Sequence, residues 1–190
     1  LTRLIPPVFE MARKRSALPD ADAARENRAA ILTLAFYANR RGLAALVPAA
    51  RQWPRPKPLT VTLAGRADSP LHFLISAAIA AESGTPLADA VGLYKEVADS
   101  RGGSGFSFND LAADRAGTRL GERAVRNPGW LQERLARGVA ESDLLPDISD
   151  LPEFLTAEEF GKRYGNFEAP PYLLMMREIE TRLDTLSLLR

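Results

Sequence analysis

The sequence predicts an all-α fold: a single helical domain, residues 1–190, of about six or seven helices around a central three-helix unit. Two observations predict it. Apolar residues recur with the three- and four-residue spacing of amphipathic helices, and prolines, glycines and capping residues mark where several helices begin and end. Only residues 59–65 alternate like a β-strand, and a lone strand has no partner, so we expect one isolated extended segment there.

The composition indicates a folded domain and excludes several kinds of partner and site. The chain has 190 residues, of which 46% are hydrophobic and 26% charged, as in ordinary globular proteins. Its 25 basic and 24 acidic residues nearly cancel, so no nucleic-acid partner is expected, and the net charge does not indicate an anionic membrane either. The longest apolar run, 71–81, is shorter than the roughly 20 residues of a membrane-spanning helix, so no transmembrane segment is expected. The absence of cysteine excludes disulfides and thiolate metal sites.

The first third of the chain is predicted to contain two helices and a linker. Residues 1–16 carry apolar side chains at helical spacing, with two prolines near the first turn, where a helix tolerates them. Residues 20–42 open with aspartates suited to capping and close at Gly42. Residues 53–67 form an extended, proline-rich linker, which explains the basic residues around Trp53 more simply than a nucleic-acid site does.

The central unit, residues 68–126, is predicted to contain three helices, over about 70–84, 86–100 and 107–126. The first two begin where a capping hydroxyl precedes a proline, and the third begins at an S-x-x-D capping box. These start signals are Ser69-Pro70, Thr85-Pro86 and Ser107 with Asp110.

The C-terminal third is predicted to contain three more helices. One begins at Asn127-Pro128 and is followed by an irregular connection, LLPDISDLPE. The next has a capping box at Thr156 and Glu159 and stops at Gly165. The last begins after two prolines and carries an apolar stripe at Leu173, Met176, Ile179, Leu183 and Leu186.

Polar residues on the three central helices form the candidate functional site. On the first helix, His72 and Ser76 are four residues apart and therefore share a face. The second helix has two acids three residues apart, and the third has two acids four residues apart. We expect the three polar faces to meet, which makes the candidate polar site His72, Ser76, Glu96, Asp99, Asp110 and Asp114.

Three glycines share these faces. Gly92 lies one turn before Glu96, and Gly117 and Gly121 continue the spacing of the third helix. Each glycine costs a helix about 1 kcal/mol relative to alanine. Close approach of a neighbouring backbone is a packing reason to accept that cost, so we expect close packing at all three positions.

The motifs of this region resemble those of a known family. They are an H-F pair with Ser76 one turn later, K-E-x-x-D-S-R at 95–101, G-x-G-F-S at 103–107 and D-x-x-x-D-x-x-G-x-x-x-G at 110–121. The pattern is similar to predicted periplasmic lipoproteins of the YfiM-like type, and more distantly to membrane-embedded VanZ-like proteins, over about residues 68–121.

This resemblance implies an envelope location, periplasmic or secreted, and a cytoplasmic location is the alternative. We also expect a protein partner in the envelope. The resemblance also implies a shared site but no known reaction. The chain departs from the lipoprotein pattern because it has no cysteine to carry a lipid and has long helical segments on both sides of the motif. The residues that the resemblance assigns to the site are His72, Glu96, Asp99, Asp110 and Asp114.

Three functional interpretations of the candidate site compete with a structural one. One imidazole with carboxylates, His72, Glu96 and Asp99, is a ligand set for a divalent metal. Residues 99–110 have the length of a calcium loop, but arginine and glycine occupy the third, fifth and seventh positions, so too few oxygen ligands remain. Glu82, just before a helix-ending glycine, would be the acid of a glycan-cleaving hydrolase.

In the structural interpretation His72 donates to a carboxylate, and the acids pair with nearby cations, which holds three packed helices in register. Those cations would be Lys95, Arg101, Arg115 and Arg119. We favour this interpretation and expect no cofactor. It predicts an envelope-associated helical domain that acts through protein contacts, and the alternative is a metal-dependent or cell-wall glycan-cleaving hydrolase that uses His72, Glu96 and Asp110.

Overall fold

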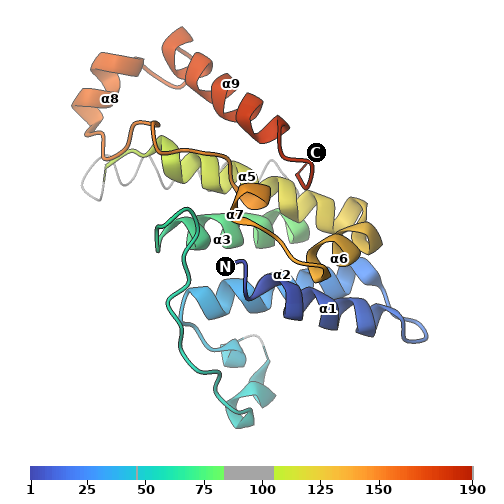
Figure 1. Cartoon of the computed structure of the whole chain (residues 1–190). Coiled ribbons are helices and arrows are strands. Elements are labelled where there is room, and N and C mark those ends of the chain that lie inside the picture. The colour runs from blue at the N-terminus through green and yellow to red at the C-terminus, as the bar shows by residue number, and fades with distance from the viewer. Residues whose placement is uncertain (46, 84–104, 190) are drawn as a thin grey trace.

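The regular structure of this protein is helical (Figure 1). The computed structural model describes residues 1–45, 47–83 and 105–189. These residues contain eight α-helices, two short 3-10 helices and no β-strand, which confirms the all-α prediction for them. The helix expected over 86–100 lies outside the described residues. No helix in the described ranges is both long enough and apolar enough to cross a bilayer.

The first two helices follow the sequence signals closely. Helix α1 (Ile5–Ser16) has both prolines in its first turn and buries one face, Ile5, Phe9 and Ala12. Helix α2 (Ala23–Ala38) begins at Asp22, whose carboxylate accepts a hydrogen bond of 2.9 Å from the N–H of Ala24. It ends four residues before the expected Gly42, because the chain turns at Arg40, which has a φ of 53°.

The segment between α2 and α3 contains two 3-10 helices, η1 (Leu43–Ala45) and η2 (Pro48–Gln52), and then an extended run. The prediction of an extended, exposed linker is right for residues 53–60. It is wrong for the inner end of the run, where Val61 and Leu63 are buried in the core. There the chain turns back on itself, and Leu63 and Arg66 exchange two backbone hydrogen bonds of 3.0 and 3.1 Å.

Helices α3 (Ser69–Ser83) and α5 (Phe108–Arg126) form the centre of the molecule. Ser107 caps α5 as expected, because its hydroxyl accepts from the N–H of Asp110 at 3.1 Å. The expected cap of α3 by Ser69 is wrong. The carboxylate of Asp68 accepts from the N–H of Ser69 at 2.8 Å, while the Ser69 hydroxyl is buried and has no hydrogen-bond partner within the described residues.

Two glycines bring α5 against α3. A Cβ atom on Gly117 would lie only 2.0 Å from the carbonyl oxygen of Phe73, and one on Gly121 would lie 2.3 Å from that of Ala77. Real side chains do not approach backbone atoms so closely, so the two helices can meet in this way only at glycine. The third glycine of the expected packing set, Gly92, lies outside the described residues.

The C-terminal part contains α6 (Pro128–Ala136), α7 (Glu141–Leu144), α8 (Ala157–Tyr164) and α9 (Pro170–Asp184). The capping box of α8 is complete, and its stop residue Gly165 has a φ of 75°. The short helix α7 was not predicted as a separate element. It follows Gly138, whose φ of 115° interrupts the helical pattern. The predicted apolar stripe is buried at Ile179 and Leu183 of α9 and at Leu186 just after it, but its first member, Leu173, is exposed.

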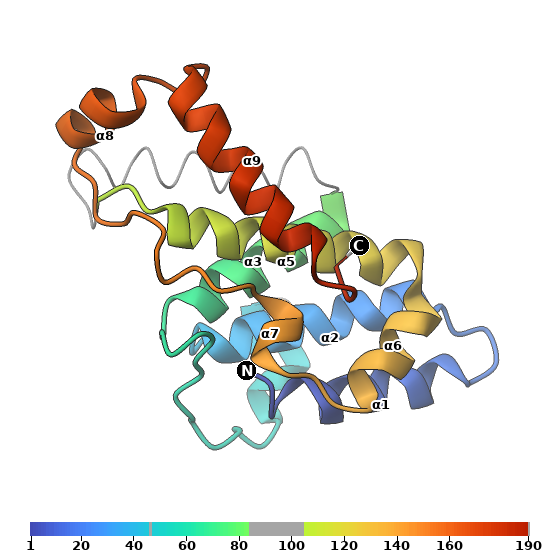
Figure 2. The same cartoon turned by 45° about the horizontal axis from the view of Figure 1, so that its top comes forward.

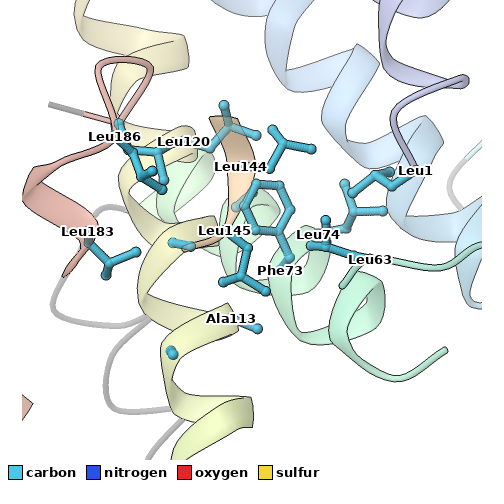
Figure 3. Close-up of a cluster of buried hydrophobic side chains, with 14 of the residues drawn as sticks. Leu1, Leu63, Phe73, Leu74, Ala113, Leu120, Leu144, Leu145, Leu183 and Leu186 are labelled. Carbon is cyan, nitrogen blue, oxygen red and sulfur yellow. The ribbon is translucent and has the colours of Figure 1, made fainter. Parts of the chain in front are cut away.

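Buried side chains from both ends of the chain belong to one hydrophobic core. Figure 3 shows Leu63, Phe73 and Leu74 gathered with Leu144 and Leu145 beside α3 and α5. A second part of the core is aromatic, with ring centroids 4.5–6.1 Å apart. Its members are Phe106, Phe108, Phe160, Tyr164, Phe167 and Tyr172.

Candidate functional site: a buried polar cluster between two helices

The polar cluster consists of two residues from each central helix. His72 and Ser76 lie on α3, Asp110 and Asp114 lie on α5, and all four are buried. They face each other because Gly117, one turn after Asp114, packs against the carbonyl of Phe73, the residue next to His72. The four-residue spacing within each helix and the close glycine contact therefore combine to place two carboxylates beside one imidazole.

Asp114 lies at the centre of the cluster. Its Oδ1 atom accepts a hydrogen bond of 2.8 Å from the hydroxyl of Ser76. Nδ1 of His72 lies 3.3 Å from both carboxylate oxygens of the same residue. The other ring nitrogen, Nε2, lies 3.5 Å from Oδ2 of Asp110. Both ring nitrogens thus face carboxylate oxygens, one from each of the two aspartates.

Arg66 closes the outer edge of the cluster. Its Nη2 atom is 3.8 Å from Oδ1 of Asp110. Its Nε and Nη2 atoms donate hydrogen bonds of 3.0 and 2.6 Å to the carboxylate of Asp68. It also donates to the carboxylate of Glu153. The hydrogen bonds from Arg66 lower the pKa of Asp68, and those to Asp68 and Glu153 raise the pKa of Arg66. The outer contacts of Asp110 are therefore fixed by a charged network.

Sequence reasoning missed Arg66, Asp68 and Glu153 as neighbours of the site. Arg66 and Asp68 come directly before α3, the helix that carries His72, and this position in the sequence could have indicated that they lie near the site. Glu153 is 87 residues from Arg66, and no spacing rule in the sequence connects the two.

Two of the cations expected to pair with the site acids serve another contact. Arg115 donates to Glu180, and Arg119 donates to Asp184 at 2.8 Å and also to Glu180. Both acids lie on or at the end of α9. The expectation that Arg119 pairs with the site acids is wrong, because its partners are the two acids of α9. These arginines attach α9 to α5.

The hydrogen-bond pattern differs from that of a nucleophilic catalyst. In a Ser-His-Asp triad the serine donates to the histidine, which in turn donates to the aspartate. Here Ser76 and His72 both contact Asp114, and the serine is buried. Within the described residues, the hydroxyl of Ser76 is therefore bound by the carboxylate of Asp114 and is not activated by the imidazole of His72.

The structure describes only one of the three proposed metal ligands, His72. Glu96 and Asp99, and with them most of the 99–110 loop, lie outside the described residues. Within the described ranges no three His, Asp or Glu side chains are placed to hold a metal ion. Glu82 is exposed at the end of α3 and lacks the enclosed apolar surroundings that suit the acid of a glycan-cleaving enzyme.

A cavity of about 450 Å³ lies beside the outer edge of the cluster. Arg66, Glu153 and the buried Asn109 line it, together with residues 146–149 of the irregular connection. His72 and Asp114 do not line it.

No family model matches this chain, and neither the curated proteins nor the solved structures contain a match. Any functional assignment therefore depends on the geometry of the site and on its short motifs.

Proposed function

We propose that this chain is an envelope-associated helical domain, periplasmic or secreted, that acts through contacts with a protein partner, and that its buried polar cluster has a structural role. The observation that carries the structural role is that Ser76 and His72 both contact Asp114 between two helices whose backbones touch. A network in which buried polar groups satisfy one another fixes the register of the helices that carry it. The envelope location is supported by the resemblance of residues 68–121 to periplasmic lipoproteins.

Phe154 is the side chain that we place at the partner contact. Its side chain is 59% exposed, although it is large and apolar. Its φ of 58° is unusual for a residue other than glycine, and such strain persists only where the surroundings hold it. The next residue, Leu155, pairs with Phe106 through two backbone hydrogen bonds of 2.7 and 2.9 Å, and the Arg66 guanidinium lies 5.9 Å from the ring centroid. The fold thus holds an exposed aromatic ring beside the polar cluster.

Affinity capture from envelope extracts tests this proposal. The wild-type chain should retain a protein partner, and Phe154→Ser should lose it. Leu18→Ser is the matched control, because Leu18 is also 59% exposed but lies after α1. Failure of the wild-type chain to retain any protein, or equal retention by the two variants, would contradict a contact at Phe154.

A metal-dependent or glycan-cleaving hydrolase that uses His72, Glu96 and Asp110 is the second candidate. The contact of 3.5 Å between Nε2 of His72 and Oδ2 of Asp110 favours it, because it places the imidazole of one proposed catalytic residue beside the carboxylate of another. Arg66 lies on the same side, with Nη2 3.8 Å from Asp110. Metal analysis of native protein separates the two proposals. A stoichiometric transition metal that is lost in a folded His72→Ala variant would overturn the structural role.

A further inference from the structure

A basic lobe projects from the helical bundle between α2 and α3. We define it as residues 39–60, of which the structure describes all but residue 46. Figures 1 and 2 show it extending away from the bundle on the side opposite to α8 and α9. It contains no acidic residue, and all five of its cations are exposed: Arg40, Arg41, Arg51, Arg55 and Lys57.

These cations are not used within the fold. None of the five forms a salt bridge within the described residues, whereas arginines elsewhere in the chain, such as Arg66, Arg119 and Arg182, are paired with acids. The chain as a whole has a formal net charge of only +1. The lobe therefore concentrates positive charge in a molecule that is otherwise balanced, which favours an anionic partner at this position.

Large apolar side chains are exposed on the same lobe. Trp53 is 52% exposed, Leu59 is 51% exposed and Val47 is 40% exposed. Tryptophan prefers the boundary between lipid headgroups and acyl chains, and leucine and valine gain free energy when they enter that boundary. A nucleic acid would stack a base on Trp53 but would have no use for the two aliphatic side chains. The combination favours an anionic lipid surface.

The lobe is held in place before it meets a partner. Pro54, Pro56 and Pro58 restrict the backbone of its extended segment, and the Tyr37 hydroxyl donates to the carbonyl of Lys57 at 2.6 Å. The chain then enters the core at Val61. A surface that is already ordered loses less conformational entropy on binding.

The charged residues of the groove between the lobe and α2 do not cancel the positive charge of the lobe. It has a volume of about 710 Å³ and carries Asp20, Asp22 and Glu26 against Arg15 and Arg25. Glu26 is paired with Arg15 at 2.7 Å. The groove charges nearly cancel, so the positive excess belongs to the lobe.

We infer that the lobe is a membrane-surface contact: its cations bind anionic phospholipid headgroups while Trp53 and Leu59 enter the interface. This inference deepens the envelope-associated function proposed above and depends on it for the choice of lipid over other polyanions. The contact would place the lobe on the membrane and leave α8 and α9, on the far side, available to a protein. Because surface electrostatics are screened, the contact should weaken with salt.

Vesicle flotation with the full chain tests the inference. The protein should float with vesicles of equal parts phosphatidylcholine and phosphatidylglycerol at low salt, and should stay in solution with phosphatidylcholine alone. The double variant Arg55→Gln, Lys57→Gln should bind the anionic vesicles roughly ten- to thirtyfold more weakly, because each surface cation contributes appreciably. The control Lys162→Gln, Arg177→Gln removes the same charge from exposed positions of α8 and α9 and should bind like the wild type.

Tryptophan fluorescence supplies a second readout. The chain has two tryptophans, so Trp130→Phe leaves Trp53 as the only one, and its emission should shift to the blue on anionic vesicles. Absence of vesicle binding, or equal weakening by both double variants, would overturn the inference. Binding of an oligonucleotide that is lost in the lobe variant, without vesicle binding, would overturn it in favour of a nucleic-acid surface. The capture experiment on Phe154 is independent, so failure of one proposal leaves the other distinguishable.

Discussion

At the scale of single residues, Asp114 connects the two central helices. It accepts from Ser76 and faces Nδ1 of His72, and all three side chains are excluded from solvent. A buried carboxylate that loses its partners, or buried donors that lose their acceptor, leaves polar atoms unsatisfied. The stability of the α3–α5 pair should therefore depend on the charge of Asp114 and not only on its shape.

Asp114→Asn tests this dependence, because it preserves the volume and removes the charge. We expect it to lower the free energy of unfolding by about 1–3 kcal/mol, measured by urea denaturation. The matched control is Asp184→Asn, which removes a carboxylate from the 2.8 Å contact with Arg119 at a position where the side chain is 68% exposed. This exposed pair should contribute less than about 1 kcal/mol. Equal effects of the two variants would mean that the cluster does not depend on the central carboxylate.

Much of the polar cluster was predictable at this scale. The four-residue spacing predicts that His72 shares a helix face with Ser76, and Asp110 with Asp114. These two polar faces contact each other in the structure. The orientation of the hydrogen bonds was not predictable, because it depends on the distance between α3 and α5. Glu153 was equally hidden, since it reaches Arg66 only through the folding of a long irregular connection.

At the scale of elements, the contact between α3 and α5 is set by glycine. Local signals predicted α5 and its cap well, because the Ser107 hydroxyl accepts from the N–H of Asp110 within one turn. They failed at the start of α3, where Ser69 before a proline also suited a cap but Asp68 supplied the acceptor. They also failed at Leu173, because helical periodicity predicts which residues share a face but not how far along a helix its neighbour extends.

Gly117→Ala separates packing from helix propensity. Alanine favours a helix by about 1 kcal/mol, but the added Cβ would lie 2.0 Å from the carbonyl oxygen of Phe73. We expect the helices to separate and the free energy of unfolding to fall by about 1–3 kcal/mol. Gly161→Ala in α8 is the control, because nothing lies within 4 Å of its added Cβ, and it should raise stability slightly. A gain in melting temperature for Gly117→Ala would contradict the close contact.

At the scale of the whole molecule, two kinds of contact attach α8 and α9 to the rest. One is the set of ion pairs from Arg115 and Arg119 to Glu180 and Asp184, together with the pair between Arg182 of α9 and Asp150. The other is the aromatic part of the core, in which Phe160 of α8 contacts Phe106, Phe167 and Tyr172 with ring centroids 4.5–6.0 Å apart. Partly exposed ion pairs stabilise little, whereas buried aromatic rings stabilise strongly. The aromatic contacts should therefore hold the two helices.

Phe160→Ala and Glu180→Gln distinguish the two contributions. Removal of the buried ring should cost about 3–5 kcal/mol and increase hydrogen exchange in α8 and α9 more than in α1 and α2, because the cavity opens between these helices and the start of α5. Glu180→Gln removes the shared acceptor of two arginines but leaves the core filled, so exchange in α9 should change little. If Glu180→Gln increased hydrogen exchange in α9 as strongly as Phe160→Ala does, the ion pairs would be the main contact that attaches α8 and α9 to the rest of the molecule. The aromatic residues would then contribute little to that attachment.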